Sequence, residues 1–163
     1  MQLLPYKEET IILPYSALEA YRRLKALTKP VNEGLHYSPA EDRAFLFNGL
    51  LKKEGFRISR KLVRPENFLP LLVGHIEATS VGCLVFVRYR LFFATTLYLV
   101  FWTVVCVLMS LFFLLHQEAW GYAALAFGIG CAQYVIAVKN FALQVRRSRA
   151  VLDQAFFSNP LPG

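Results

Sequence analysis

The sequence lacks the cysteine pattern of a disulfide scaffold or of a zinc site. Its three cysteines, Cys83, Cys106 and Cys131, are odd in number and show no CxxC spacing, so neither kind of site is expected. The N-terminus also lacks a basic start followed by an apolar stretch, and no cleavable signal peptide is predicted. We therefore expect structural thiols and an internal signal for membrane insertion.

Motifs of nucleophilic and phosphate chemistry are missing as well. There is no GxSxG elbow and no glycine-rich phosphate loop, because the glycines are scattered singly. His75 and Glu77 lie two apart on a predicted strand and His36 lies in a predicted loop, but no fourth metal ligand accompanies them. We predict no metal, no cofactor and no catalytic residues, and a function other than catalysis is preferred.

Charged residues are absent from two long apolar runs, 91–115 and 119–138. A helix of the first run would be about 37 Å long, enough to cross the hydrocarbon core of a bilayer. Only the short polar segment 116–118 separates the runs, so they are predicted to form an antiparallel transmembrane hairpin.

Lysine and arginine are absent from the connecting segment and gather at the outer ends of both runs. Arg88 and Arg90 precede the first run, while Lys139, Arg146, Arg147 and Arg149 follow the second. By the positive-inside rule both termini are cytoplasmic. The chain is thus predicted to be a multi-pass protein of the inner (plasma) membrane.

Small and hydroxyl side chains form a stripe on each predicted span. They are Thr96, Thr103 and Ser110 in the first span, and Ala124, Gly128 and Ala132 in the second. One interpretation is that the two stripes pack on each other and the hydroxyls bond back to their own helix; the alternative is that a stripe forms a homo-oligomer. A conduction pathway is disfavoured, because neither span contains an ionisable acidic or basic residue.

Residues 1–90 are predicted to form a small cytoplasmic α+β domain. Ser16 and Glu19 have the spacing of a capping box, which begins an amphipathic helix that Pro30 ends. A short β-like stretch, 10–13, precedes this helix, and 31–42 is predicted to be a loop. Alternating patterns then favour four antiparallel strands in the segments 45–51, 56–63, 68–78 and 82–89.

Residues 139–163 are predicted to form a cytoplasmic tail helix that continues the second span. Its apolar stripe, Phe141, Val145, Leu152 and Phe156, is suited to cover the sheet. The fold class is therefore an α+β membrane protein, built from an antiparallel sheet with one amphipathic helix, a transmembrane hairpin at 91–138 and a closing helix.

The chain carries a net charge of +7, and six of its cations lie around the second predicted strand. They are Lys52, Lys53, Arg57, Arg60, Lys61 and Arg64. One interpretation is a solvated surface that fixes the topology; the functional one is recognition of an anionic lipid, a small anionic ligand or a partner protein. Nucleic acid is disfavoured, because the nearby aromatic residues Phe45, Phe47 and Phe56 fall on the predicted core face.

Two classes of function follow from these residues. The preferred one is a membrane-anchored binding or accessory module without catalytic activity, in contact with the lipid bilayer. The alternative is a membrane-bound enzyme that acts on a lipid or a nucleotide, with His36, His75 and Glu77 beside the arginines as its polar residues.

Three motifs, F-x-G at 47–49, F-x-I-x-R at 56–60 and an N-x-F-L-P-x-x-x-G-x-I-like pattern at 67–76, precede the predicted hairpin. Over roughly 45–155 the chain resembles a group of uncharacterised small bacterial proteins with two transmembrane helices. That group usually has a serine between the Asn and the Phe of the third motif, whereas Asn67 here adjoins Phe68 directly. The order of strand, helix, sheet and closing helix is also similar to the helix-grip ligand-binding fold, with the hairpin inserted before the closing helix.

Overall fold

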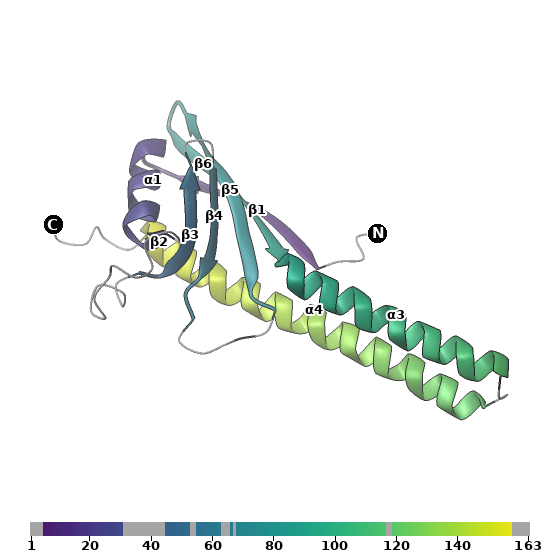
Figure 1. Ribbon diagram of the computed structural model, residues 1–163. Coiled ribbons are helices and arrows are strands. Elements are labelled where there is room, and N and C mark those ends of the chain that lie inside the picture. Colours follow the sequence, from purple (N-terminus) through teal and green to yellow (C-terminus); the bar gives the residue numbers. More distant parts are fainter. Residues whose placement is uncertain are drawn as a thin grey trace.

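The computed structural model describes residues 5–30, 45–52, 55–62, 66, 68–116 and 119–157. Within these ranges the chain is an α+β protein with a six-stranded sheet and three helices (Figure 1). In chain order the elements are β1 (Tyr6–Leu13), α1 (Ala17–Ala26), β2 (Thr28–Pro30), β3 (Phe47–Lys52), β4 (Gly55–Arg60), β5 (Pro70–Thr79), β6 (Gly82–Leu91), α3 (Phe93–His116) and α4 (Trp120–Phe157). The predicted loop at 31–42 lies outside the described residues.

The sheet has the strand order β1-β6-β5-β4-β3-β2. Its two hairpins, β3–β4 and β5–β6, are antiparallel and confirm the four predicted strands. The prediction of a purely antiparallel sheet is wrong, because β2 pairs with β3 in parallel at one edge. At the other edge β1 pairs antiparallel with β6 and adds a further strand. β2 has only three residues, too few for a period-two pattern, and the partner of β1 is distant in the sequence.

Helix α1 begins where the capping pattern predicts. The Ser16 Oγ accepts a hydrogen bond from the Glu19 backbone N–H at 3.3 Å, which satisfies one of the free donors of the first turn. The Glu19 carboxylate pairs with Arg23 one turn later, at 2.9 Å. The helix ends at Ala26 rather than at Pro30, since residues 28–30 are taken up by β2.

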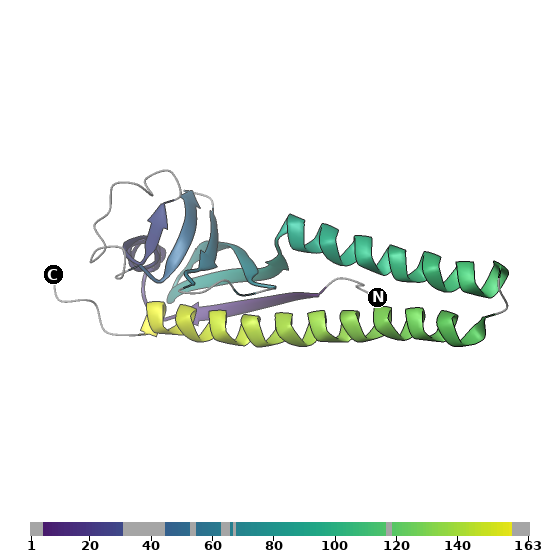
Figure 2. The same ribbon diagram turned by 60° about the horizontal axis from the view of Figure 1, so that its bottom comes forward.

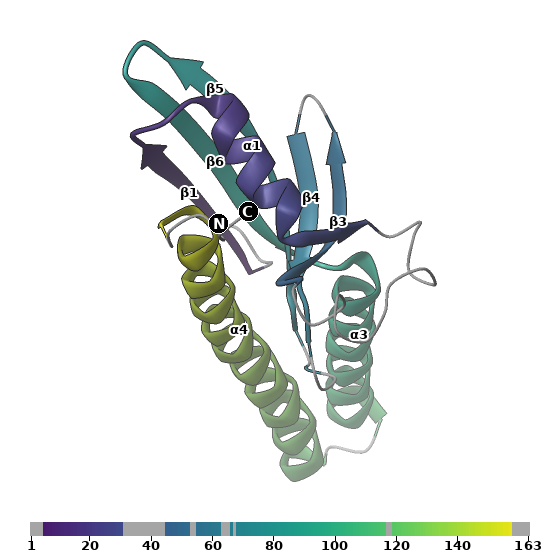
Figure 3. The same cartoon turned by 90° about the vertical axis from the view of Figure 1, so that its left-hand side faces the viewer.

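The core lies on the face of the sheet that α1 and the second half of α4 cover, and Figure 3 shows both helices on that side. Buried apolar side chains from the strands include Ile58, Leu72, Val85 and Val87, while α1 contributes Leu24. From α4 come Phe141, Val145, Leu152 and Phe156, which confirms that the predicted tail stripe covers the sheet. No helix that the structure describes covers the opposite face of the sheet, called the open face below (Figure 2).

Helices α3 and α4 lie side by side and extend well beyond the sheet (Figure 2). Both are long and apolar enough to cross a membrane. Of the most apolar 18-residue segment, only 6% is buried in α3 and 11% in α4. α3 and the first half of α4 are therefore exposed, whereas the second half of α4 belongs to the core. α4 is a single helix of 38 residues, about 57 Å long, so the predicted second span and the predicted tail are one element.

The first predicted stripe faces α4 at Ser110, whose Oγ donates a hydrogen bond to the backbone carbonyl of Ala123 at 3.1 Å. Thr103 bonds back to the Leu99 carbonyl of its own helix at 2.8 Å, and Thr96 is half-buried near the sheet. Part of the predicted stripe therefore lies in the contact between the two long helices.

The second predicted stripe points away from α3. Ala124, Gly128 and Ala132 are exposed, and a Cβ added at Gly128 would meet no atom within 4 Å. Ala123 and Gly130 make the contact instead, so the interpretation in which this stripe packs on the first span is wrong. Spacing shows that small residues share a face but not which face meets the neighbour. Contact between copies through this stripe stays a prediction.

Replacing Gly130 with leucine should separate α3 from α4, whereas Gly128→Leu should not. A Cβ at position 130 would lie 3.0 Å from the Cβ of Cys106 on α3, and such overpacking costs about 1–3 kcal/mol. Unfolding of both variants in detergent, followed by circular dichroism, measures the difference. Equal midpoints would contradict this packing, and a larger loss for Gly128→Leu would support contact between copies.

Candidate functional site

The open face of the sheet carries arginines at the end from which α3 leaves. Strand register places Arg57 of β4, Val73 of β5 and Arg88 of β6 in one row across the sheet. Arg90 lies two residues after Arg88 and therefore points to the same face. Three guanidinium groups from two different strands thus share one end of the open face.

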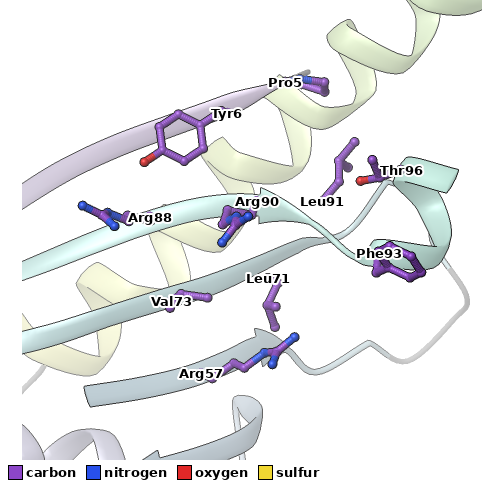
Figure 4. A pocket seen from close by; sticks show the side chains of 10 residues that line it. All are labelled: Pro5, Tyr6, Arg57, Leu71, Val73, Arg88, Arg90, Leu91, Phe93 and Thr96. Carbon is purple, nitrogen blue, oxygen red and sulfur yellow. The ribbon is translucent and has the colours of Figure 1, made fainter. Parts of the chain in front are cut away.

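These arginines line an open hollow of about 770 Å³, shown in Figure 4. Its floor is apolar and includes Leu71 and Val73 of β5, and its far end is formed by Phe93 and Thr96 of α3. The hollow therefore joins the cationic part of the sheet to the beginning of the first long apolar helix.

Two of the three arginines have no acidic partner within the part of the chain that the structure describes. The Arg88 Nε pairs with the Glu8 Oε1 at 2.8 Å, and the Tyr6 hydroxyl donates to the same carboxylate. That hydrogen bond raises the pKa of Tyr6, so the phenol stays neutral. Arg57 and Arg90 are exposed and form no ion pair with any residue that the structure describes. They leave the hollow positively charged.

Arg60 does not belong to this surface. Its Nη2 lies 2.6 Å from the Glu66 Oε2 and donates to the Gln144 Oε1 of α4 at 2.9 Å, and its side chain is only 17% exposed. A hydrogen bond from Gln144, together with the Arg60 charge, lowers the pKa of Glu66. Arg60 thus links the end of β4 to α4, which is a structural role.

The other predicted cations are spread out. Lys52 is exposed at the end of β3, on the open face but not among the residues that line the hollow. Lys61 follows the end of β4 and is half-buried. Lys53 and Arg64 lie outside the described residues. Of the predicted cations that the structure describes, only Arg57 lines the hollow.

Sequence reasoning missed Arg88 and Arg90 as site residues, because it used them only to orient the hairpin. The signal was their alternation with the apolar residues Val87 and Tyr89, which places both arginines on one face of a strand. What the sequence could not supply is the register that brings Arg57 into the same row.

His75 and Glu77, the residues of the alternative enzyme interpretation, lie further along the open face. The His75 Nε2 is 3.0 Å from the Glu77 Oε1, and its ring stacks on Phe86 with centroids 4.8 Å apart. Both side chains are largely exposed and neither lines the hollow. The described residues contain no group of three or more metal-ligating side chains, and His36 lies outside them.

A further polar cluster lies on the covered face, between β1, β6 and α4. Arg149 of α4 contacts Glu9 at 3.3 Å and Asp153 at 3.0 Å. Beside them Tyr89 is fully buried, and burial raises the pKa of its hydroxyl. This cluster attaches the second half of α4 to the sheet edge.

Comparison with protein-family models, with curated proteins and with solved structures gave no match. The resemblances to small bacterial two-span proteins and to the helix-grip fold therefore stay predictions. The geometry of the hollow itself carries the functional argument.

Proposed function

We propose that the chain is a membrane-anchored binding module, without catalytic activity, whose open face holds an anionic ligand at the bilayer surface. The observation that carries this proposal is the hollow, in which Arg57 and Arg90 have no ion-pair partner among the described residues. Unpaired guanidinium groups at one end of a sheet are well suited to bind phosphate or carboxylate oxygens.

The membrane anchor in this proposal is the hairpin of α3 and the first half of α4. Its support is the length, composition and exposure of the two helices. Lys and Arg flank the outer ends of the hairpin and are absent from 116–119, which favours cytoplasmic termini and a plasma-membrane location. The hollow would then lie on the cytoplasmic side, close to the headgroups.

Binding is favoured over catalysis because no carboxylate, imidazole, amine or thiol side chain is among the described residues that line the hollow. Among the described residues that line it, the ionisable groups are the three arginines and Tyr6. Guanidinium groups do not lose their protons in proteins, and the raised pKa of Tyr6 keeps that phenol neutral. Such groups hold and neutralise an anion but do not take up a proton from it.

The double variant Arg57→Gln, Arg90→Gln should lose affinity for pyrophosphate, a compact anionic probe. Each charge-assisted hydrogen bond contributes about 1.5–3 kcal/mol. We therefore expect the dissociation constant of pyrophosphate to rise at least tenfold. The measurement is calorimetric titration of the full chain in nanodiscs of neutral phosphatidylcholine.

The matched control is Arg22→Gln, Arg146→Gln, which removes the same charge from exposed sites on α1 and α4. It should bind pyrophosphate like the wild type, apart from a small salt-dependent change. Equal losses in the two double variants would contradict a site at the hollow and indicate a general effect of net charge.

A further inference from the structure

We propose that the hollow is a site for one anionic phospholipid, with its phosphate between Arg57 and Arg90 and an acyl chain along α3. This inference rests on the proposed function and names the ligand class of the same site. Four features of the described residues support it: the position of the hollow, its mixed lining, the track of apolar side chains that leaves it, and the spacing of its unpaired charges.

The position of the hollow matches the boundary between headgroups and hydrocarbon. Arg90 precedes Phe93, the first residue of α3, by three positions, which is about 10 Å of extended chain. If Phe93 lies at the outer edge of the hydrocarbon, the Arg90 guanidinium lies at the depth of lipid phosphates. A lipid can reach this site without leaving the bilayer.

The lining of the hollow suits an amphipathic ligand better than a free anion. Apolar side chains from Leu71, Val73 and Leu91 lie beside the arginines, and Figure 4 shows Leu71 between the side chains of Arg57 and Arg90. A small soluble anion would gain nothing from this apolar floor. The glycerol backbone and the first methylene groups of a lipid would cover this floor and remove its apolar surface from water.

An apolar track leads from the hollow along α3. Phe93, Leu97 and Val100 are 80%, 57% and 46% exposed, and their i, i+4, i+7 spacing puts them on one face of the helix. Phe93 belongs both to the hollow and to this track. An acyl chain lying on the track would place the attached headgroup beside the arginines.

The charges fit a phosphate held from two sides. Arg57 and Arg90 come from β4 and β6, which are separated only by β5, and Arg90 is offset by two residues along its strand. Their Cα atoms are therefore about 12 Å apart. Long guanidinium side chains span half of that distance and donate paired hydrogen bonds to phosphate oxygens. Arg88, held by Glu8, adds positive potential at the side of the site. The positive charge of these arginines favours a doubly charged phosphomonoester over a singly charged phosphodiester.

The test is native mass spectrometry of the full chain, titrated with phosphatidic acid or phosphatidylcholine in mild detergent. We expect the wild type to bind phosphatidic acid at least tenfold more tightly than phosphatidylcholine, and Arg57→Gln, Arg90→Gln to lose that preference. The charge control Arg22→Gln, Arg146→Gln should keep it. Equal binding of the two lipids by the wild type would overturn the inference.

A second variant, Leu97→Ser, separates a lipid from a free anion. Leu97 belongs to the apolar track, is 57% exposed and does not line the hollow. Its replacement should weaken phosphatidic acid binding several-fold and leave pyrophosphate binding unchanged. The control is Leu125→Ser, an equally apolar position on α4 that is 60% exposed.

The outcomes separate this inference from the proposed function. Arginine-dependent binding of pyrophosphate without a preference for phosphatidic acid would leave the proposed function standing and overturn the lipid inference. Binding of both probes that is independent of Arg57 and Arg90 would overturn both. Phosphatidic acid binding that depends on the arginines but not on Leu97 would overturn the acyl-chain contact.

Discussion

Replacing Gly74 with valine should prevent the sheet from forming. A Cβ at this position would overlap the backbone carbonyl oxygen of Phe86 and lie 2.6 Å from the Cζ of Phe56. The strand cannot move aside, because Gly74 is paired with Phe56 on β4 and with Val87 on β6. We expect a loss of more than about 3 kcal/mol in the free energy of unfolding, which is a large part of the stability of a small domain.

The measurement is the urea midpoint of the full chain in detergent, followed by circular dichroism and by resistance to proteolysis. The matched control is Ala78→Val, four residues along the same strand but exposed near the tip of the β5–β6 hairpin. It should change the free energy of unfolding by no more than about 0.5 kcal/mol. Similar midpoints for the two variants would contradict the close approach of Phe56 to Gly74.

Leu152→Ala should be the second most damaging change, although Leu152 lies far along the chain from the sheet. Its side chain is fully buried in the core cluster beneath the strands, and removal of a buried leucine side chain costs about 2–5 kcal/mol. The same change at Leu143, on the same helix but 45% exposed, should cost well under 1 kcal/mol. Both substitutions introduce alanine, so helix propensity does not separate them.

Unfolding of the two leucine variants under the conditions used for Gly74 measures this difference. A small loss of stability in both variants would mean that the second half of α4 does not form part of the core and does not cover the sheet. A large shift in both would indicate that Leu143 is buried in an assembly of several copies.

The elements that sequence alone predicts here are those that local contacts determine. The N-cap at Ser16, the β3–β4 and β5–β6 hairpins and the apolar stripe of the tail each involve residues close together or a strong periodicity. The pairing of β1 with β6 brings Leu13 opposite Cys83. No local pattern indicates that partner, and the sheet was accordingly predicted with four strands instead of six.

In the candidate site, too, local patterns predict which face a residue lies on but not its distant partners. Side-chain alternation along β4 puts Arg60 with Phe56 and Ile58 on the inner face and Arg57 on the open face. The partners of Arg60 are Glu66, which precedes β5, and Gln144 of α4, and they could be recognised only in three dimensions. Likewise the hollow requires residues from β4, β5, β6 and α3 together, a combination that depends on strand register and on the direction in which α3 leaves the sheet.

The continuity of α4 has a consequence for how the chain is made. All six strands lie within residues 6–91, whereas the helix segment that covers their inner face, 141–156, is synthesised only after the hairpin. At about 5–20 residues per second, several seconds of translation separate the last strand from its cover. A hairpin that turns back brings this segment beside the sheet. In a nascent chain whose hairpin fails to do so, the part of the inner face that α4 covers would stay exposed beside α1. Exposed apolar surface of that kind is recognised by chaperones and proteases.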